Sequence, residues 1–199
     1  MTFSLVTQSE EETGLLGERL GALLCGGSVV LLSGDLGAGK TRFAQGVARG
    51  LGVVGNVTSP TFNLVLEYPL ELRDGAALEQ RDGVGVPLFV PKSGTPTPSL
   101  CSKAAPSLSS ILRHFDLYRL DQAEQLDDLD YFGLIEDPDA VSLVEWGSKF
   151  ASHLPLEYIL VQLMVDEASP GSRIIELSAE GVGSEEVLQR FALAEGLAT

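Results

Sequence analysis

Residues 34–41 have the types and spacing of a phosphate-binding loop. They read Gly-Asp-Leu-Gly-Ala-Gly-Lys-Thr, which fits the Walker A pattern G-x-x-x-x-G-K-[ST]. Glycines let the backbone N–H groups of such a loop turn toward phosphate oxygens, and the following helix adds the positive end of its dipole. Lys40 would neutralise the β- and γ-phosphates, and the Thr41 hydroxyl would be a magnesium ligand. The alternative is a tight strand-to-helix turn with an incidental lysine, and the flanking residues disfavour it.

Two acidic residues are candidates for holding magnesium beside this loop. A phosphate-binding loop needs a carboxylate at the end of a neighbouring strand to hold the metal, directly or through water. Glu145 ends an apolar strand predicted over 140–144, and Asp116 lies on the polar face of a strand predicted over 114–118. Each could instead be an ordinary polar residue of a strand end or an edge strand. Beside such a loop we favour the metal role for both, and the sequence leaves open which one contacts the metal directly.

An α/β fold is needed to bring these residues together. The chain alternates strand-like and helix-like patterns, and an apolar strand over 28–32 leads straight into the loop. The other predicted elements are a helix opening at Ser9, a helix after the loop to Leu51, a strand over 62–68, an acidic helix over 122–129, an antiparallel hairpin over 158–165 and 173–177, and a closing helix over 184–194. We expect an α/β, P-loop NTPase-like three-layer sandwich with a mixed, mainly parallel sheet and a C-terminal antiparallel hairpin.

Residues 69–110 differ in kind from the rest of the chain. They hold six of the ten prolines, are rich in Ser and Gly, and show no sustained period. Because they lack the apolar residues to fold alone, we expect an inserted surface loop rather than a second domain. The 199 residues would then form a single domain, 1–199, with an insertion at about 69–110.

Charge and composition limit the function classes. Lys plus Arg is 13 against 28 for Asp plus Glu, a net charge of −15, and such a surface repels a phosphate backbone. The N-terminus lacks the pattern of a secretory signal, no apolar run is long enough to cross a membrane, and Cys25 and Cys101 form no CxxC pair, which suits a reducing compartment. We expect a cytoplasmic protein that does not act in a membrane and meets nucleic acid only through a partner.

Four sequence blocks resemble the bacterial TsaE (YjeE) family of small P-loop ATPases in order and wording. They are GDLGAGKT, TSPTFNLVLEY, HFDLYRL and LVEW, and the resemblance covers about residues 5–180 apart from the insertion. It implies a role in forming threonylcarbamoyladenosine at position 37 of tRNAs that read ANN codons. It also implies weak ATPase activity alone and action with TsaD and TsaB, which transfer the threonylcarbamoyl group, through an ATP cycle that resets their complex. The family has a short connection where this chain has its insertion, which leaves partner docking near that edge open.

The resemblance also implies roles for particular residues. The residues that would bind the phosphates of ATP or ADP are Gly37, Ala38, Gly39, Lys40 and Thr41. Mg²⁺ would be held by Thr41 and Glu145, with Asp116 supporting the metal or the catalytic water, so Asp116 and Glu145 are the catalytic candidates. Thr13 would lie against the adenine, and Trp146 near the nucleotide and the partner surface. Residues 58–61, Thr-Ser-Pro-Thr, would sense the nucleotide, although they also fit an ordinary turn before a strand.

Two other function classes stay open at this point. A small-molecule or nucleoside kinase usually has a lid with several arginines, whereas the insertion offers only Arg73 and Arg81. A scaffold in which ATP only stabilises the fold cannot be separated from an ATPase by sequence. Arg119 and Arg173 are weaker candidates for contacts to phosphate or base, because surface arginines usually make neither.

Overall fold

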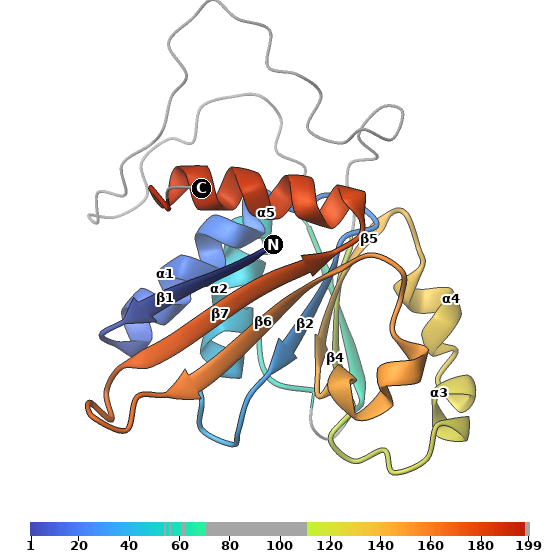
Figure 1. The fold of residues 1–199 in the computed structure, drawn as a ribbon. Helices are drawn as coiled ribbons and strands as arrows, with labels where there is room; N and C mark the ends of the chain where they lie inside the picture. The colour runs from blue at the N-terminus through green and yellow to red at the C-terminus, as the bar shows by residue number, and fades with distance from the viewer. Residues whose placement is uncertain (54, 56, 61–62, 71–110, 198–199) are drawn as a thin grey trace, which may run out of the picture.

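A seven-stranded mixed sheet forms the centre of the protein. The structure is a computed structural model that describes residues 1–53, 55, 57–60, 63–70 and 111–197. The strands, in chain order, are β1 (Thr2–Thr7), β2 (Val29–Ser33), β3 (Val65–Pro69), β4 (Ile111–Asp116), β5 (Ala140–Glu145), β6 (Tyr158–Val165) and β7 (Arg173–Glu180). Across the sheet they follow the order β1-β7-β6-β2-β5-β4-β3 (Figure 1).

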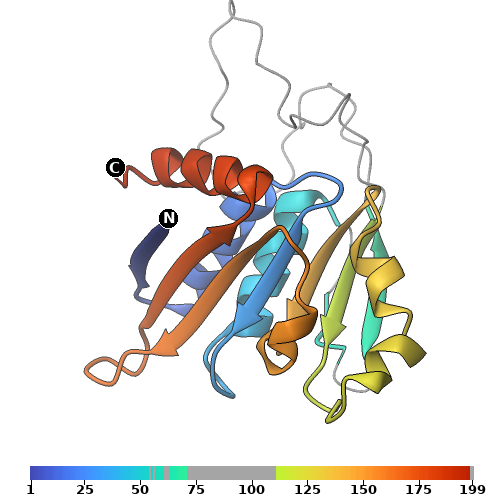
Figure 2. The same cartoon turned by 45° about the vertical axis from the view of Figure 1, so that its right-hand side comes forward.

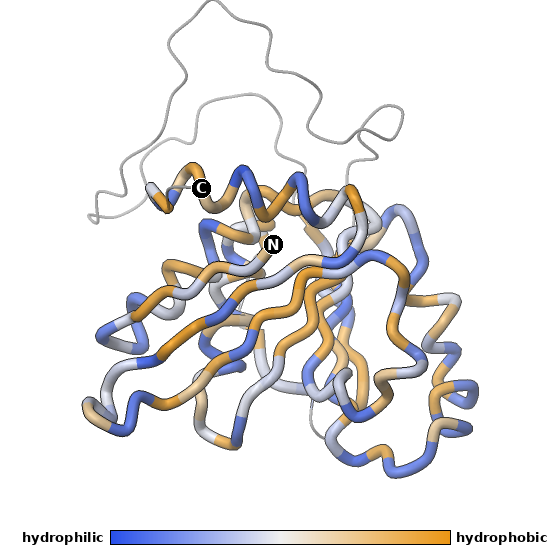
Figure 3. Tube along the Cα trace, in the orientation of Figure 1, coloured by the Kyte–Doolittle hydropathy of each residue, from blue (hydrophilic) through white to orange (hydrophobic). Residues whose placement is uncertain are grey.

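The sheet has a parallel core and antiparallel edges. Strands β6, β2, β5 and β4 are parallel neighbours, and β6 and β7 form an antiparallel hairpin. At the two edges of the sheet, β1 pairs antiparallel with β7 and β3 pairs antiparallel with β4. This confirms the predicted mixed sheet and the C-terminal hairpin. Apolar residues are concentrated in the strands, as Figure 3 shows.

Helices cover both faces of the sheet and complete the three layers (Figure 2). The helical elements are α1 (Glu10–Gly21), α2 (Lys40–Leu51), α3 (Glu124–Asp128), α4 (Tyr131–Ile135), the 3₁₀ helix η1 (Gly147–His153) and α5 (Val182–Ala194). Alternate residues of β2 point to opposite faces: Val30 packs with the side of α1, α2 and α5, and Leu31 with the side of α3, α4 and η1. Because β2 is buried on both faces from Val29 to Leu32, these four residues are all apolar.

The parallel core places the predicted site residues together at the carboxyl ends of its strands. The carboxyl ends of parallel strands meet at the same edge of a sheet. In the β2–β5 register Leu32 lies opposite Glu145, and in the β4–β5 register Asp116 lies opposite Glu145. Glu145 therefore ends its strand between the end of β2, where the loop begins, and Asp116.

Several element boundaries differ from the sequence prediction. The acidic segment predicted over 122–129 forms the short helix α3, whereas α4 and η1 were not predicted. Strand β1 was also missed; its pairing with β7, from Thr2 opposite Ser178, joins the two ends of the chain and leaves no local signal. The helix opening at Ser9 is confirmed, since the Ser9 hydroxyl accepts a hydrogen bond from the Glu12 N–H at 3.2 Å.

Three further expectations from the sequence concern the insertion, membrane crossing and the cysteines. Most of the predicted insertion, residues 71–110, lies outside the described residues. Among the residues that are described, no helix is long and apolar enough to cross a membrane. Cys101, one of the two cysteines on which the expected reducing compartment depends, lies outside the described residues.

Candidate phosphate-binding site

The loop between β2 and α2 has the backbone of an anion-binding turn. Gly34, Gly37 and Gly39 have φ angles of +138°, +81° and +103°, a region that glycine enters without steric cost. A side chain at Gly34 would clash with the Leu163 carbonyl oxygen of β6. Gly39 is the N-cap of α2, and no side chain caps it. The first N–H groups of α2, with the positive end of the helix dipole, are therefore available to an anion.

Lys40 is a buried cation at the centre of this site. Lys40 is only 6% exposed. Its ammonium donates hydrogen bonds to the carbonyl oxygens of Gly34 and Asp35 at 2.7 and 2.9 Å. The ammonium also lies 4.4 Å from the centre of the Trp146 ring. Burial lowers the pKa of Lys40, and the negative charges of Glu145, Asp116 and Asp35 act in the opposite direction. The carboxylates at the ends of β4 and β5 thus share one electrostatic environment with the loop lysine.

The two carboxylates are buried and held by hydrogen bonds. Glu145 and Asp116 are 3% and 4% exposed. Glu145 Oε1 lies 3.0 Å from Nε2 of His114, which is itself fully buried on β4. Asp116 accepts hydrogen bonds from the Tyr118 N–H at 3.0 Å and from the Ser59 hydroxyl at 3.2 Å. Buried carboxylates with fixed partners hold their oxygens in defined positions.

The donor set fits magnesium that is shared with a phosphate ligand. In the described part of the chain no group of three or more His, Cys, Asp or Glu side chains could enclose a metal by itself. Mg²⁺ is usually bound through one or two carboxylates together with substrate phosphates and waters. Glu145, Asp116 and the Thr41 hydroxyl supply hard oxygen donors of this kind, so the residues present fit Mg²⁺.

The remaining predicted residues also lie around the loop. Thr13 is buried on α1; its hydroxyl is 2.8 Å from that of Thr7, and its methyl group would be 3.7 Å from a Cβ built on Gly39. Trp146 has a φ of +63°, which is rare for a bulky residue, and its ring lies 5.1 Å from that of Tyr118. Both Thr13 and Trp146 are therefore beside the predicted phosphate-binding loop.

Among the described residues of the predicted sensing segment, Ser59 reaches the same site. Ser59 contacts Asp116, as described above, whereas the Thr58 N–H donates to the Tyr68 hydroxyl at 3.3 Å. Pro60 is buried, and Thr61 lies outside the described residues. Of the described residues 58–60, Ser59 is therefore one that joins the carboxylate cluster.

Two residues of this region were not singled out from the sequence. His114 entered only as part of a polar strand face, and Lys149, whose ammonium donates to the carbonyl oxygens of Tyr118 and Leu120 at 2.7 and 2.6 Å, did not enter at all. Arg173, a weaker candidate for contacts to phosphate or base, donates to carbonyl oxygens of the loop. The alternation of β4 could have singled out His114, but nothing in the sequence places Lys149 or Arg173 there.

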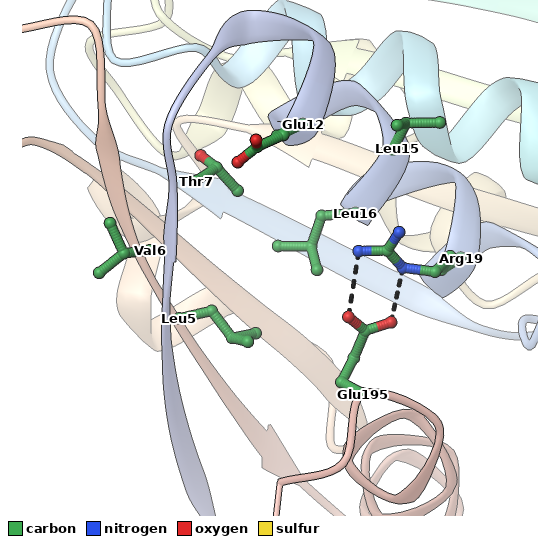
Figure 4. A pocket seen from close by; sticks show the side chains of 8 residues that line it. All are labelled: Leu5, Val6, Thr7, Glu12, Leu15, Leu16, Arg19 and Glu195. Atoms are coloured by element: carbon green, nitrogen blue, oxygen red, sulfur yellow. Dashed lines mark hydrogen bonds and ion pairs between the residues drawn. The ribbon is translucent and has the colours of Figure 1, made fainter.

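A separate cavity of about 190 Å³ lies between β1, α1 and the C-terminal end of α5. Figure 4 shows its lining and the ion pair of Arg19 with Glu195, which has an N–O distance of 2.6 Å. None of its lining residues belongs to the loop or to the carboxylate cluster. It touches the site only indirectly, because its lining residue Thr7 shares a hydrogen bond with Thr13.

The fold and this site together define a class of protein. A glycine-rich loop joins a central parallel strand to a helix, and carboxylates end the adjacent parallel strands, as in P-loop NTPase-like α/β proteins. The family model described as "Threonylcarbamoyl adenosine biosynthesis protein TsaE" matches residues 7–78 and 92–175. The chain belongs to the TsaE family.

Individual relatives agree with this assignment. The chain is 37% identical over 157 residues to the tRNA threonylcarbamoyladenosine biosynthesis protein TsaE of Mycobacterium tuberculosis, covering 77% of this chain and 73% of the relative. It is 32% identical over 176 residues to the protein of the same name from Bacillus subtilis, covering 88% and 84%. The crystal structure of Bacillus subtilis YdiB aligns over 98% of this chain and 97% of its own, with a TM-score of 0.64 and 26% identity.

Proposed function

We propose that this chain is a magnesium-dependent ATPase of tRNA threonylcarbamoyladenosine biosynthesis. It would act with a complex of TsaB and TsaD on the modification at position 37 of tRNAs that read ANN codons, and therefore in the cytoplasm, where tRNA is modified. Membership of the TsaE family supports the pathway. The observation that supports the ATPase is that Lys40 begins α2, directly after the loop that follows β2, while Glu145 and Asp116 end the neighbouring parallel strands β5 and β4.

Each loop residue would have a distinct part in binding ATP. Backbone N–H groups between Gly37 and Thr41, apart from that of Ala38, which donates to the Asp35 carbonyl, would hold the phosphates. The buried Lys40 ammonium would attract them strongly because few water molecules screen it. Its hydrogen bonds to loop carbonyls keep the ammonium at this position. Thr13 beside Gly39 and Trp146 beside Lys40 would contact the rest of the nucleotide.

The acidic residues would hold the metal and the attacking water. Thr41 and Glu145 would bind Mg²⁺, which when bound supplies positive charge to the phosphates as they react. Asp116, with both oxygens in hydrogen bonds to Ser59 and Tyr118, would orient water or support the metal. His114 would keep the Glu145 carboxylate turned to its position at the end of β5.

The charge of the protein favours partners that carry the tRNA contact. With a net charge of −15, the protein and a tRNA phosphate backbone repel each other. TsaB and TsaD would therefore bind the tRNA, and this chain would affect it only through their complex. The hydrolysis of ATP would reset that complex between turnovers.

The test compares ATP hydrolysis by the wild type and by Lys40→Ala, with and without TsaB and TsaD. We expect slow magnesium-dependent release of inorganic phosphate by the wild type, faster release with the partners, and a loss of about 100-fold or more in the variant. The thermal midpoint of Lys40→Ala should stay close to the wild-type value.

Three outcomes would contradict the proposal. Equal rates with and without saturating partners would argue against the role in the complex. Transfer of labelled phosphate to a nucleoside or small metabolite, rather than to water, would indicate a kinase. Unfolding of Lys40→Ala, with no wild-type turnover, would indicate a scaffold that ATP only stabilises.

A further inference from the structure

Arg173 connects the C-terminal hairpin to the phosphate-binding loop. It is the first residue of β7, and in the described part of the chain its guanidinium donates to backbone carbonyl oxygens. Nη1 donates to Pro170 and Ser172 of its own hairpin at 2.9 and 2.8 Å. Nε donates to Ala38 at 3.0 Å, and Nη2 to Gly37 at 3.3 Å. Nη1 of the guanidinium therefore fixes the side chain to its own hairpin, and Nε and Nη2 bind the loop.

These contacts determine which way two loop peptides face. In a planar trans peptide the C=O and N–H groups point in opposite directions. Because the Ala38 carbonyl is bound to Arg173, the N–H of Gly39 in the same peptide is directed away from Arg173. The carbonyl of Gly37 is bound in the same way, while the Ala38 N–H donates to the Asp35 carbonyl at 3.1 Å. Arg173 thus binds both peptides from one side of the turn, and the Gly39 N–H lies on the other side.

The loop needs such an external support. Gly37 and Gly39 have positive φ angles, and a Cβ on Gly37 would meet no atom within 4 Å. Glycine has many accessible backbone conformations, so fixing it costs more entropy than fixing any other residue. Hydrogen bonds from a planar, preorganised guanidinium select one orientation of these peptides before a ligand arrives.

We infer that Arg173 is a positioning residue for the phosphate-binding loop, which it holds in the conformation that accepts the β-phosphate of the nucleotide. The inference rests on the proposed function, because it assumes that the loop binds ATP and ADP. Arg173 would act through the carbonyl groups of Gly37 and Ala38, to which its guanidinium donates.

The test measures dissociation constants for ADP and AMP by competition with a fluorescent ADP analogue. Removing the fork in Arg173→Ala should weaken ADP binding about 10-fold, because the phosphate-facing amides lose their fixed orientation. AMP lacks the β-phosphate that the loop would hold, so its affinity should change less than about 2-fold. Arg173→Lys keeps the charge and can donate to one carbonyl, so we expect an intermediate loss for ADP.

Arg49→Ala is the matched control. Arg49 lies on α2, the helix that follows the loop, and pairs with Glu18 of α1 at 3.1 Å. This variant makes the same change of charge without touching Gly37 or Ala38, and its ADP affinity should equal that of the wild type. Thermal midpoints without nucleotide show whether each variant is folded.

The outcomes separate this inference from the proposed function. Wild-type ADP affinity in Arg173→Ala would overturn the inference, and so would an equal loss for ADP and AMP, which would mean a general structural role. If Arg173→Ala does not fold, Arg173→Lys decides by the same ADP-to-AMP comparison. Failure of the wild type itself to bind ADP would overturn the proposed function and the inference with it.

Discussion

His114 and Glu145 form a fully enclosed pair at the end of two adjacent strands. Their side chains are 0% and 4% exposed, and the two atoms in contact are 3.0 Å apart. The other ring nitrogen of His114, Nδ1, has no hydrogen-bond partner among the described residues. A buried polar atom without a partner lowers the stability of the fold, so His114 is expected to cost stability at this position. Under the proposed function, His114 would hold the Glu145 carboxylate in position, which would account for a histidine at this place.

Substitution of His114 should therefore impair turnover more than folding. In His114→Ala we expect ATP hydrolysis to fall by about 10-fold or more, and the Mg²⁺ concentration for half-maximal activity to rise, because partners of ligating carboxylates commonly contribute this much. His114→Gln can donate to Glu145 and should recover part of the loss. The measurement is a magnesium titration of the hydrolysis rate at saturating ATP.

Tyr68→Phe is a suitable control for this prediction. Tyr68 lies on β3, the neighbour of β4. Among the described residues, its hydroxyl forms hydrogen bonds with the backbone of Thr58 alone. The variant should leave the magnesium dependence unchanged. A His114→Ala protein with wild-type magnesium dependence would show that the pair does not serve the metal site.

At the scale of elements, α1 and α2 approach each other through glycines. A Cβ at Gly17 or Gly21 of α1 would clash with backbone atoms of α2, and a Cβ at Gly46 or Gly50 of α2 would clash with backbone atoms of α1. Small residues at such spacing let two helix backbones come into direct contact. Since Lys40 and Thr41 begin α2, this packing also sets the position of the site.

Gly46→Ala should be strongly destabilising despite the better helix propensity of alanine. Its methyl group would overlap the Gly14 carbonyl, which cannot move without moving α1. Overpacking of this kind costs about 1–3 kcal/mol, more than the roughly 1 kcal/mol gained from propensity. We expect a lower free energy of unfolding in urea. Gly183→Ala in α5 is the control, because its methyl group meets only the movable Glu157 carboxylate and stability should not fall.

Arg113 ties three elements together from a buried position on β4. Its guanidinium pairs with Glu67 of β3 and with Asp137, both at 2.7 Å, and donates to the Leu134 carbonyl of α4 at 3.0 Å. Burial alone would lower the pKa of Arg113, but its hydrogen bonds to the two carboxylates raise it overall. The pKa of Asp137 is lowered, first by the Asp139 N–H and then by Arg113.

This pKa gives the pH dependence of the contact. A carboxyl whose pKa is lower in the folded state stabilises the protein above its unfolded pKa, and the contribution is lost as the pH falls through the folded value. Asp137→Asn should therefore cost about 1–2 kcal/mol at pH 7, and the difference from wild type should shrink below the ordinary value of 3.8. Urea unfolding at several pH values checks this, and a difference independent of pH would contradict it.

Asp121→Asn is the control for that measurement. Asp121 is 89% exposed and lies 3.8 Å from Lys149, so water screens the pair and its removal should change stability by less than about 0.5 kcal/mol.

At the scale of the whole molecule, the ends of the predicted insertion lie away from the candidate site. Pro69 of β3 is paired directly with Ile111 of β4 in the antiparallel ladder. Ile111 and Asp116 are the two ends of β4, about 16 Å apart at the usual rise per residue. We propose that the chain is a single domain. Its insertion joins β3 to β4 at the end of these strands that is remote from Asp116.

Removal of the insertion should then leave the isolated protein active. We expect a variant in which an Asn-Gly turn replaces residues 71–110 to fold and to hydrolyse ATP within about 2-fold of the wild type, since loop length affects stability only weakly. The hydrolysis rate with TsaB and TsaD would show whether the insertion takes part in docking. Loss of the basal rate would mean that the insertion belongs to the site.

The sequence by itself determined the loop, its flanking strand and helix, and the two carboxylates as candidates, because these depend on local pattern and on residue chemistry. Gly34 to Thr41 could be interpreted from eight adjacent residues, and Glu145 from the strand it ends. Only the tertiary structure decided that Ser59 contacts Asp116, that His114 contacts Glu145 and that Arg173 binds the loop. Those contacts join segments from 31 to 135 residues apart, and strand register and helix packing, which create them, leave no mark on the local sequence.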